Sequence, residues 1–196
     1  FATVYRAVER ASGRTVALKV VDTRKLREAG VDRERLEREV ALHSTCDHER
    51  IVRCEGSFAF NEQRLGTEDD SVEDFEGVCL VLEYCSKSDL RQLLKRKGRL
   101  KDEEAKTYLR GVLQGLEYLH SKNVVHRDVK LANVLLDDNH RTKLCDFGVA
   151  ACTEEGERWT LCGTPNYVAP EIVNGETAHG TAVDLWSVGC LAHALL

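Results

Sequence analysis

The sequence predicts an α+β fold with two lobes, a small β-rich lobe at residues 1–83 and a mainly helical lobe at residues 84–196. Runs of β-branched residues dominate the first part of the chain, whereas apolar residues at helical spacing dominate the second. A length of 196 residues is enough for one large domain or two small lobes. We expect the hinge near residues 83–85, where the last strand of the first lobe ends.

The first lobe is predicted to contain several strands and one helix. Residues 15–21 follow a turn at Ser12 and Gly13 and are rich in β-branched side chains, which is typical of a strand. Residues 31–43 are highly charged, but their apolar members recur at helical spacing and predict a helix. Two further strands are expected at 51–60 and 78–84.

An acidic stretch at residues 61–77 lies between the last two of these strands. It holds seven acidic residues and one arginine, a balance of −6. Removing it from the net charge of −5 leaves about +1, so the rest of the chain has no basic field for nucleic acid. We expect the stretch to be a solvated loop insertion.

The second lobe is predicted to hold three helices, short strands and one long loop. The acids at 102–104 open the second helix, because a helix N-terminus favours negative charge. The loop at 148–171 contains both prolines, which makes it a candidate substrate platform or switch. The helices are expected at 88–97, 102–122 and from about 183 to the end, and the short strands at 124–125, 134–136 and 143–145.

Composition excludes several classes of protein. The eight cysteines form no CxxC pair and most lie in apolar runs, so we expect reduced thiols in an intracellular protein and no zinc site. No apolar run approaches the roughly eighteen residues of a membrane span, and no signal peptide opens the chain. Because methionine is absent and the chain opens inside a predicted strand, we expect a fragment of a longer protein.

Two aspartates, Asp128 and Asp146, carry the strongest chemical signal. The first lies in HRDVKLAN at 126–133, where Asn133 follows it by five residues, and the second opens DFG at 146–148. Asp128 can orient a hydroxyl and accept its proton, while the Asn and the second Asp can hold Mg²⁺. Phosphoryl transfer needs that set, and the two motifs in order are far more specific than either alone. The alternative is two polar turns between short strands.

Lys19 lies on the predicted strand 15–21 and needs a carboxylate partner if it is buried. Glu34, Glu37 and Glu39 all lie on the helix that follows. We prefer Glu39, because it directly precedes an apolar residue. The pair would present an ammonium group to the α- and β-phosphates of a nucleotide. The alternative for Lys19 is a strand lysine whose ammonium group reaches solvent.

Five motifs in order resemble those of eukaryotic protein kinases. They are VALK at 16–19, HRDVKLAN at 126–133, DFG at 146–148, APE at 169–171 and DLWS at 184–187. The resemblance covers nearly the whole chain. It implies the two-lobed protein kinase-like fold, with a C-lobe truncated after one helix of its usual core. Lys130, two residues after Asp128, matches the serine/threonine pattern.

Within that family, ERWTLCGTPNY at residues 157–167 is similar to the polo-like kinases, and Ala2 in the tail of the phosphate loop also fits them. Residues 27–30 and 178–180 resemble the Sak branch of these kinases, which controls centriole duplication. Lys130 departs from vertebrate members of that branch, which carry threonine there. Aurora kinases share TLCGT but not the following PNY.

The resemblance implies a role for each matching residue. Asp128 would be the catalytic base, Lys130 would neutralise charge on the γ-phosphoryl group, and Asn133 and Asp146 would hold Mg²⁺. The adenine ring would be sandwiched by Val4, Ala17 and Leu135, with Leu82 as gatekeeper. The backbones of Glu83 and Cys85 would bind the adenine edge, and Asp89 would reach the ribose. The alternative for Asp89 is an ordinary helix N-cap. The alternative for the apolar residues is plain core packing.

Thr160 is the candidate regulatory residue. A phosphate there would add about −2 charge and could pair with Arg127, next to the catalytic base. The alternative is an exposed loop threonine. Thr164 is similar to the threonine that helps to select a serine or threonine acceptor, and we expect it to bond to Asp128 or Lys130.

The sequence therefore predicts a protein serine/threonine kinase that uses ATP and Mg²⁺ and acts on serine or threonine of protein substrates, with no nucleic-acid or membrane partner. The resemblance places it inside the cell, in the cytoplasm or at the centrosome, centriole or nucleus, with a role in the cell cycle or in centriole control. The rival hypothesis is an ATP-binding pseudokinase, a scaffold or an inactive kinase fragment. A small-molecule kinase of the same fold is disfavoured by the APE segment.

Overall fold

A computed structural model describes residues 2–30, 32–65, 72–152, 163–174 and 180–196. The chain folds into two units, each with its own internal contacts. The first unit comprises Phe1–Thr45 and Arg53–Tyr84, and the second comprises Cys46–Val52 and Cys85–Leu196. The segment 46–52 therefore folds with the second unit, although the sequence assigned it to the first lobe.

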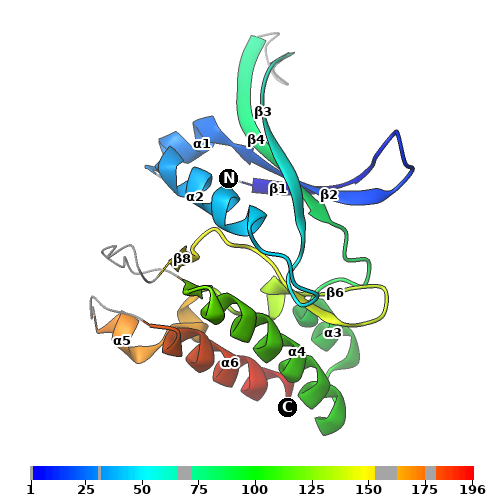
Figure 1. The fold of residues 1–196 in the computed structure, drawn as a ribbon, viewed down its shortest axis with the longest axis vertical. Helices are drawn as coiled ribbons and strands as arrows, with labels where there is room; N and C mark the ends of the chain where they lie inside the picture. The colour runs from blue at the N-terminus through cyan, green and yellow to red at the C-terminus, as the bar shows by residue number, and fades with distance from the viewer. Residues whose placement is uncertain (1, 31, 66–71, 153–162, 175–179) are drawn as a thin grey trace. The chain divides into compact units, whose positions relative to one another are not determined.

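The first unit contains an antiparallel sheet of four strands, in the order β1-β2-β4-β3 (Figure 1). Its strands are β1 (Ala2–Val8), β2 (Thr15–Asp22), β3 (Cys54–Leu65) and β4 (Val72–Glu83). The register places Lys19 of β2 opposite Val4 of β1 and Leu80 of β4. Because β2 has a neighbour on each side, both rows of its backbone groups have partners within the sheet.

The predicted loop insertion at 61–77 is wrong for most of its length. The two strands continue past the expected loop ends, with pairs from Asn61 and Glu76 out to Leu65 and Val72, so only 66–71 lie outside the described residues. Each added pair satisfies backbone groups whatever the charge of its side chains, so composition alone does not reveal the hairpin. The predicted strand start at residue 51 is also wrong, since Ile51 bridges to Leu144 in the second unit.

Two helices precede β3, where the sequence predicted one. They are α1 (Thr23–Glu28) and α2 (Arg33–Ser44). The side chain of Asp22 accepts two backbone N–H groups in the first turn of α1, and that of Asp32 accepts one in the first turn of α2. Gly30, with φ of 70°, lies between them and adopts a conformation that interrupts a helix. The two aspartates were the signal that would have separated these helices.

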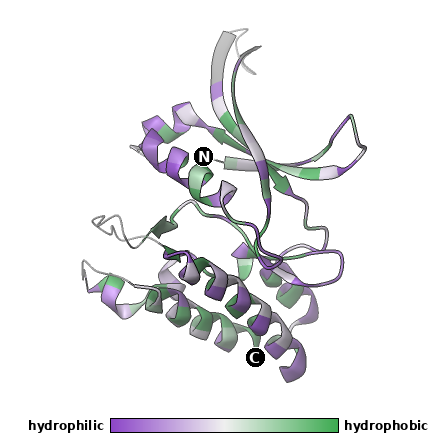
Figure 2. Cartoon of the chain, viewed as in Figure 1, coloured by the Kyte–Doolittle hydropathy of each residue, from purple (hydrophilic) through white to green (hydrophobic). Residues whose placement is uncertain are grey.

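Three longer helices and two small two-stranded sheets lie in the described part of the second unit. Its elements are α3 (Leu90–Lys97), α4 (Asp102–Ser121), β5 (Val124–Val125), η1 (Leu131–Asn133), β6 (Val134–Leu136), β7 (Thr142–Leu144), β8 (Ala151–Cys152), η3 (Pro165–Tyr167), α5 (Pro170–Val173) and α6 (Ala182–Leu195). Strand β5 pairs with β8, and β6 pairs with β7. Figure 2 contrasts the mainly hydrophobic α6 with the mainly hydrophilic α2 of the first unit.

The predicted loop at 148–171 is only partly a loop. In its described part it contains β8, η3 and the start of α5, while residues 153–162 lie outside the described residues. Pro165 and Pro170 each occupy the first position of a short helix, where a proline lacks no hydrogen bond that the helix needs. The prolines therefore start helices in this segment.

Seven of the eight cysteines are described, and all seven are free thiols. Cys46 and Cys79 are buried. Within the part of the chain that the structure describes, no helix is both long enough and apolar enough to cross a membrane.

Candidate active site

Lys19 and Glu39 form an ion pair in the first unit. The Nζ atom of Lys19 on β2 lies 2.6 Å from Oε1 of Glu39 on α2. Their side chains are only 14% and 10% exposed. A charge so far out of water is costly without a partner, so each residue makes the burial of the other tolerable.

The helical repeat of α2 explains why the partner is Glu39. Leu36, Glu39 and His43 are the buried residues of this helix, and their spacing of three and four residues places them on one face. The two rival glutamates face elsewhere, since Glu34 lies near Arg38 and Glu37 pairs with Arg33. The choice made from the adjacent Val40 therefore agrees with the observed contact.

In the second unit, a buried carboxylate fixes the backbone before Asp128. Asp184 on α6 is fully buried and accepts the backbone N–H of His126 at 2.9 Å and of Arg127 at 2.8 Å. Arg127 has φ of 65°, a left-handed conformation that is uncommon outside glycine. The two hydrogen bonds hold the chain in that conformation, which directs the next side chain, Asp128.

The carboxylate of Asp128 is held by three side chains. Lys130 Nζ lies 2.7 Å from its Oδ2, and Asn133 Nδ2 donates to the same oxygen at 2.9 Å. Thr164 Oγ1 donates to Oδ1 at 2.8 Å and accepts from Lys130 Nζ at the same distance. The sequence expected Thr164 to contact Asp128 or Lys130, and it contacts both. The arrangement holds the carboxylate in a fixed orientation, as a positioned proton acceptor requires.

A backbone hydrogen bond links the residue before Asp146 to Asn133, the other candidate metal ligand. The N–H of Cys145 donates to the carbonyl of Asn133 at 3.0 Å. Asp146 itself has φ of 69° and is exposed, whereas the following Phe147 is buried and packs near the ring of His126. The exposed carboxylate of Asp146 is therefore followed directly by the buried side chain of Phe147.

The donor set fits Mg²⁺. The cation prefers carboxylate and amide oxygens and is held by few protein ligands, with phosphate oxygens and water supplying the rest. Asn133 uses its amide nitrogen on Asp128, which directs the amide oxygen elsewhere. Asp146 and Asn133 are thus the residues that could hold the cation.

The residues expected around adenine are distributed over both units. Ala17 lies opposite Leu82 in the sheet, Leu82 is buried, and Val4 is 63% exposed. The backbone N–H of Glu83 donates to the carbonyl of Arg53. In the second unit, Asp89 and Leu135 form an isolated bridge, and Cys85 is partly buried. Asp89 also accepts the N–H of Gln92 and caps α3, which was the alternative reading of this residue.

Thr160 lies outside the described residues. Its expected partner, Arg127, donates from Nε to the carbonyl of Val149. The pairing of these two residues after phosphorylation therefore stays a prediction.

His120 is a residue of this site that the sequence reasoning missed. Its Nε2 atom lies 2.8 Å from Oδ2 of Asp184, the same oxygen that accepts the N–H of His126. The side chain is 18% exposed and comes from the last turn of α4. The available signal was a histidine close to a helix end and six residues before His126.

The chain is similar in sequence to proteins of a known family. The sequence model of the "Protein kinase domain" matches residues 1–196, the whole chain. A maize protein, "Probable serine/threonine-protein kinase CCRP1", is 38% identical over all of this chain and 29% of that protein. "Serine/threonine-protein kinase PLK1" of Xenopus laevis is 37% identical over all of this chain and 30% of that protein.

A third relative comes from Encephalitozoon cuniculi and is named "Probable cell cycle serine/threonine-protein kinase CDC5 homolog". It is 39% identical over 94% of this chain and 37% of that protein. The chain thus spans between 29% and 37% of the length of these three curated relatives.

Proposed function

Because the chain belongs to the protein kinase domain family, we propose that it transfers the γ-phosphoryl group of Mg·ATP to serine and threonine hydroxyls of protein substrates. The relatives are named serine/threonine kinases and include polo-like members, the group that the motifs indicated. The observation that carries the proposal is the carboxylate of Asp128, which Thr164, Lys130 and Asn133 hold in one orientation.

In the proposed reaction, Asp128 accepts a hydrogen bond from the substrate hydroxyl and takes its proton as the oxygen attacks. Lys130 reaches from Asp128 toward the transferring group, where its ammonium offsets negative charge. Proteins of this family use ATP with Mg²⁺, which neutralises the phosphates and orients the γ-phosphoryl group. Asn133 and Asp146 hold the cation in this proposal, and the Lys19 ammonium binds the α- and β-phosphates.

Glu39 is proposed to hold the ammonium group of Lys19 in one direction. A partly buried ammonium group needs a carboxylate partner, because its burial is otherwise costly. The observed 2.6 Å contact supports this role. The adenine contacts named from the sequence, Val4, Ala17, Leu82, Leu135 and the backbones of Glu83 and Cys85, remain part of the proposal, as does Asp89 for the ribose.

The test is transfer of radiolabelled phosphate from Mg·ATP to casein, with the full-length protein and its Asp146→Asn variant side by side. Acid hydrolysis of the product then identifies the labelled amino acid. We expect phosphoserine and phosphothreonine from the wild-type protein and a loss of transfer in the variant. Binding of ATP without transfer in the wild-type protein would contradict the proposal and favour a pseudokinase.

We further propose a role in the cell cycle. The support is the printed name of the Encephalitozoon relative and the polo-like relatives. The Sak branch, with its centriolar role, stays a prediction from residues 27–30 and 178–180. Fluorescence imaging of the tagged full-length protein through one division cycle tests it, since a centriolar enzyme gives paired spots rather than a diffuse signal.

A further inference from the structure

Glu83, the last residue of β4, makes two hydrogen bonds with Arg53 in the first unit. Its backbone N–H donates to the carbonyl of Arg53 at 2.9 Å. In return, the backbone N–H of Arg53 donates to Oε2 of the Glu83 side chain at 3.2 Å. The backbone of Glu83 is a proposed adenine contact, whereas its carboxylate has no role in that proposal.

This pair departs from a regular antiparallel ladder. In such a ladder, the two residues of a hydrogen-bonded pair exchange both of their main-chain N–H···O=C bonds. Arg53 and Glu83 make one of these bonds between main-chain groups, but a carboxylate oxygen accepts from the second donor. The side chain of Glu83 thus occupies the place that its own carbonyl has in a regular pair.

A β-bulge next to this pair explains the departure. The register of β3 against β4 shifts between Cys54 and Gly56, so Glu55 is an extra residue in β3. Cys54 is opposite Leu82, the residue directly before Glu83. A bulge bends its strand and interrupts pairing, and bulges are over-represented beside functional sites. The pair that follows the bulge is therefore where a side chain can replace a main-chain acceptor.

We propose that the Glu83 carboxylate is a positioning group for base selection. By accepting the N–H of Arg53 in place of the Glu83 carbonyl, it orients that carbonyl toward the exocyclic amino group of adenine. A carbonyl acceptor at this edge favours adenine, whose exocyclic group is an amino donor, over guanine, whose corresponding group is an acceptor. This role rests on the proposed function, because it requires that the chain bind ATP through this backbone.

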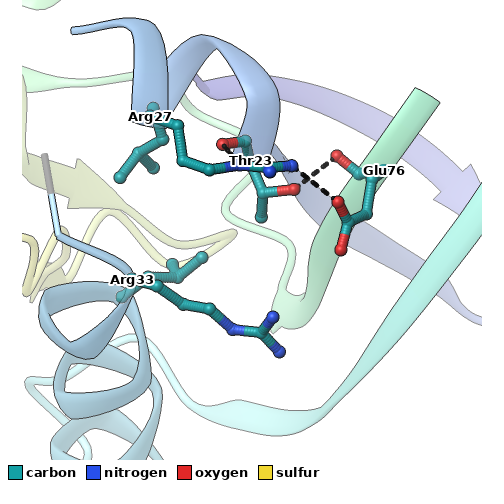
Figure 3. Close-up of a pocket in the computed structure, with 6 residues that line it drawn as sticks. Thr23, Arg27, Arg33 and Glu76 are labelled. Carbon is teal, nitrogen blue, oxygen red and sulfur yellow. Dashed lines mark hydrogen bonds and ion pairs between the residues drawn. The ribbon is translucent and has the colours of Figure 1, made fainter. Parts of the chain in front are cut away.

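The rest of β4 is held independently of the Glu83 carboxylate. Earlier on the strand, the hydroxyl of Thr23 on α1 donates to the carbonyl of Glu76 at 2.8 Å (Figure 3). Directly after Glu83, the guanidinium group of Arg6 lies over the ring of Tyr84, 5.6 Å from its centroid. We therefore expect removal of the carboxylate to change the local backbone without unfolding the strand.

The test compares two nucleotides by isothermal titration calorimetry of the full-length protein with Mg²⁺. One is ATP, and the other is purine riboside triphosphate, which lacks the exocyclic amino group. We expect the wild-type protein to prefer ATP and Glu83→Ala to lose about fivefold of that preference, as the loss of one net hydrogen bond predicts. Glu83→Gln keeps a side-chain oxygen that accepts the N–H of Arg53, so it should retain the preference.

Glu55→Ala is the matched control for the removal of a glutamate at this end of the sheet. Its carboxylate accepts two hydrogen bonds from Arg14, at 2.5 Å each, and none of them involves the Arg53–Glu83 pair. The variant should show the wild-type preference for ATP.

An unchanged preference in Glu83→Ala would overturn the positioning role, and so would an equal loss in Glu83→Gln. A protein that is merely destabilised loses affinity for both nucleotides and keeps their ratio, which counts as an unchanged preference. If Glu83→Ala fails to fold, Glu83→Asp, whose carboxylate is one methylene shorter, should show the same loss. A wild-type protein that binds no ATP would contradict the proposed function, whereas an unaltered preference in the variants contradicts the positioning role alone.

Discussion

Asp128 shows how much a single residue depends on neighbours distant in sequence. Its carboxylate oxygens contact Lys130 and Asn133, which lie within the same motif, and Thr164, which lies 36 residues away. The backbone before it is fixed by Asp184, more than 50 residues away. The motif supplies the chemical groups, and the distant residues fix the direction of the carboxylate.

Thr164 gives the sharpest prediction at this scale. Thr164→Val keeps the shape of the side chain but removes the hydroxyl that bridges Asp128 and Lys130. We expect kcat to fall about tenfold, which corresponds to the loss of one net hydrogen bond of about 1.4 kcal/mol. Steady-state kinetics with a protein substrate measure it. Thr164→Ser retains the hydroxyl and should keep most of the activity; equal losses in both variants would argue against the bridge.

Asp137 links stability to pH. Burial acts to raise the pKa of this carboxyl group, but hydrogen bonds from Arg141 and Asn139 outweigh it, so the pKa is lowered. A group whose pKa is lowered by folding stabilises the protein above its unfolded value, about 3.9, and loses that contribution as the pH falls through the folded pKa. We expect Asp137→Asn to cost about 1 kcal/mol at neutral pH.

Urea unfolding of both proteins at several pH values measures this difference. It should shrink as the pH is lowered below about 4. A difference that stays constant down to the acid limit would show that the charge of Asp137 contributes nothing.

At the scale of elements, α4 packs so closely that its glycines matter. A Cβ atom built on Gly111 would lie 2.0 Å from Oγ1 of Thr142 on β7. One built on Gly115 would lie 3.0 Å from a methyl carbon of Leu144. Glycine lowers helix propensity, so its presence here is explained by the approach of the hairpin β6–β7 to the helix.

Gly111→Ala should therefore destabilise the protein, against the usual gain. In an open helix position the change adds about 1 kcal/mol of stability, whereas here the overlap with Thr142 should cost about 1–3 kcal/mol. Gly189→Ala on α6 is the matched control, since nothing lies within 4 Å of the added carbon. Urea unfolding measures both, and Thr142→Ala should rescue the Gly111→Ala variant. A stabilised Gly111→Ala protein would show that the helix and hairpin are less tightly packed.

At the scale of the whole molecule, the proposed nucleotide contacts draw on both units. Lys19 and Glu39 belong to the first unit, and Asp128, Asn133 and Asp146 belong to the second. A ligand that binds only the folded chain stabilises it by mass action. Thermal unfolding therefore reports nucleotide binding without any catalytic step.

Mg·ATP at about 100 times its Kd should raise the free energy of unfolding by about 2.7 kcal/mol. Removing the cation with EDTA should lower this gain if, as proposed, Asn133 and Asp146 bind the cation. Asp146→Asn should show the smaller gain with or without Mg²⁺. Differential scanning calorimetry checks it, and a wild-type protein that responds equally to ATP with and without Mg²⁺ would contradict the assignment of these two residues.

The sequence by itself determined the fold family, the order of the motifs and the residue types of the candidate site. The sequence also favoured Glu39 over Glu34 and Glu37, because Glu39 directly precedes the apolar Val40 within one helix. The long helix α4 and the strand β2 were predicted for the same reason, since their patterns are local. Features that depend only on a local sequence pattern were therefore predictable from the sequence.

Only the tertiary structure decided the rest. The continuation of β3 and β4 into a hairpin, the place of residues 46–52 in the second unit and the contact of His120 with Asp184 all depend on pairing between distant segments. The bridge from Thr164 to Asp128 and Lys130 has the same origin. Such contacts form because folding brings together groups whose separation in sequence carries no periodic signal, and burial then requires each polar group to find a partner.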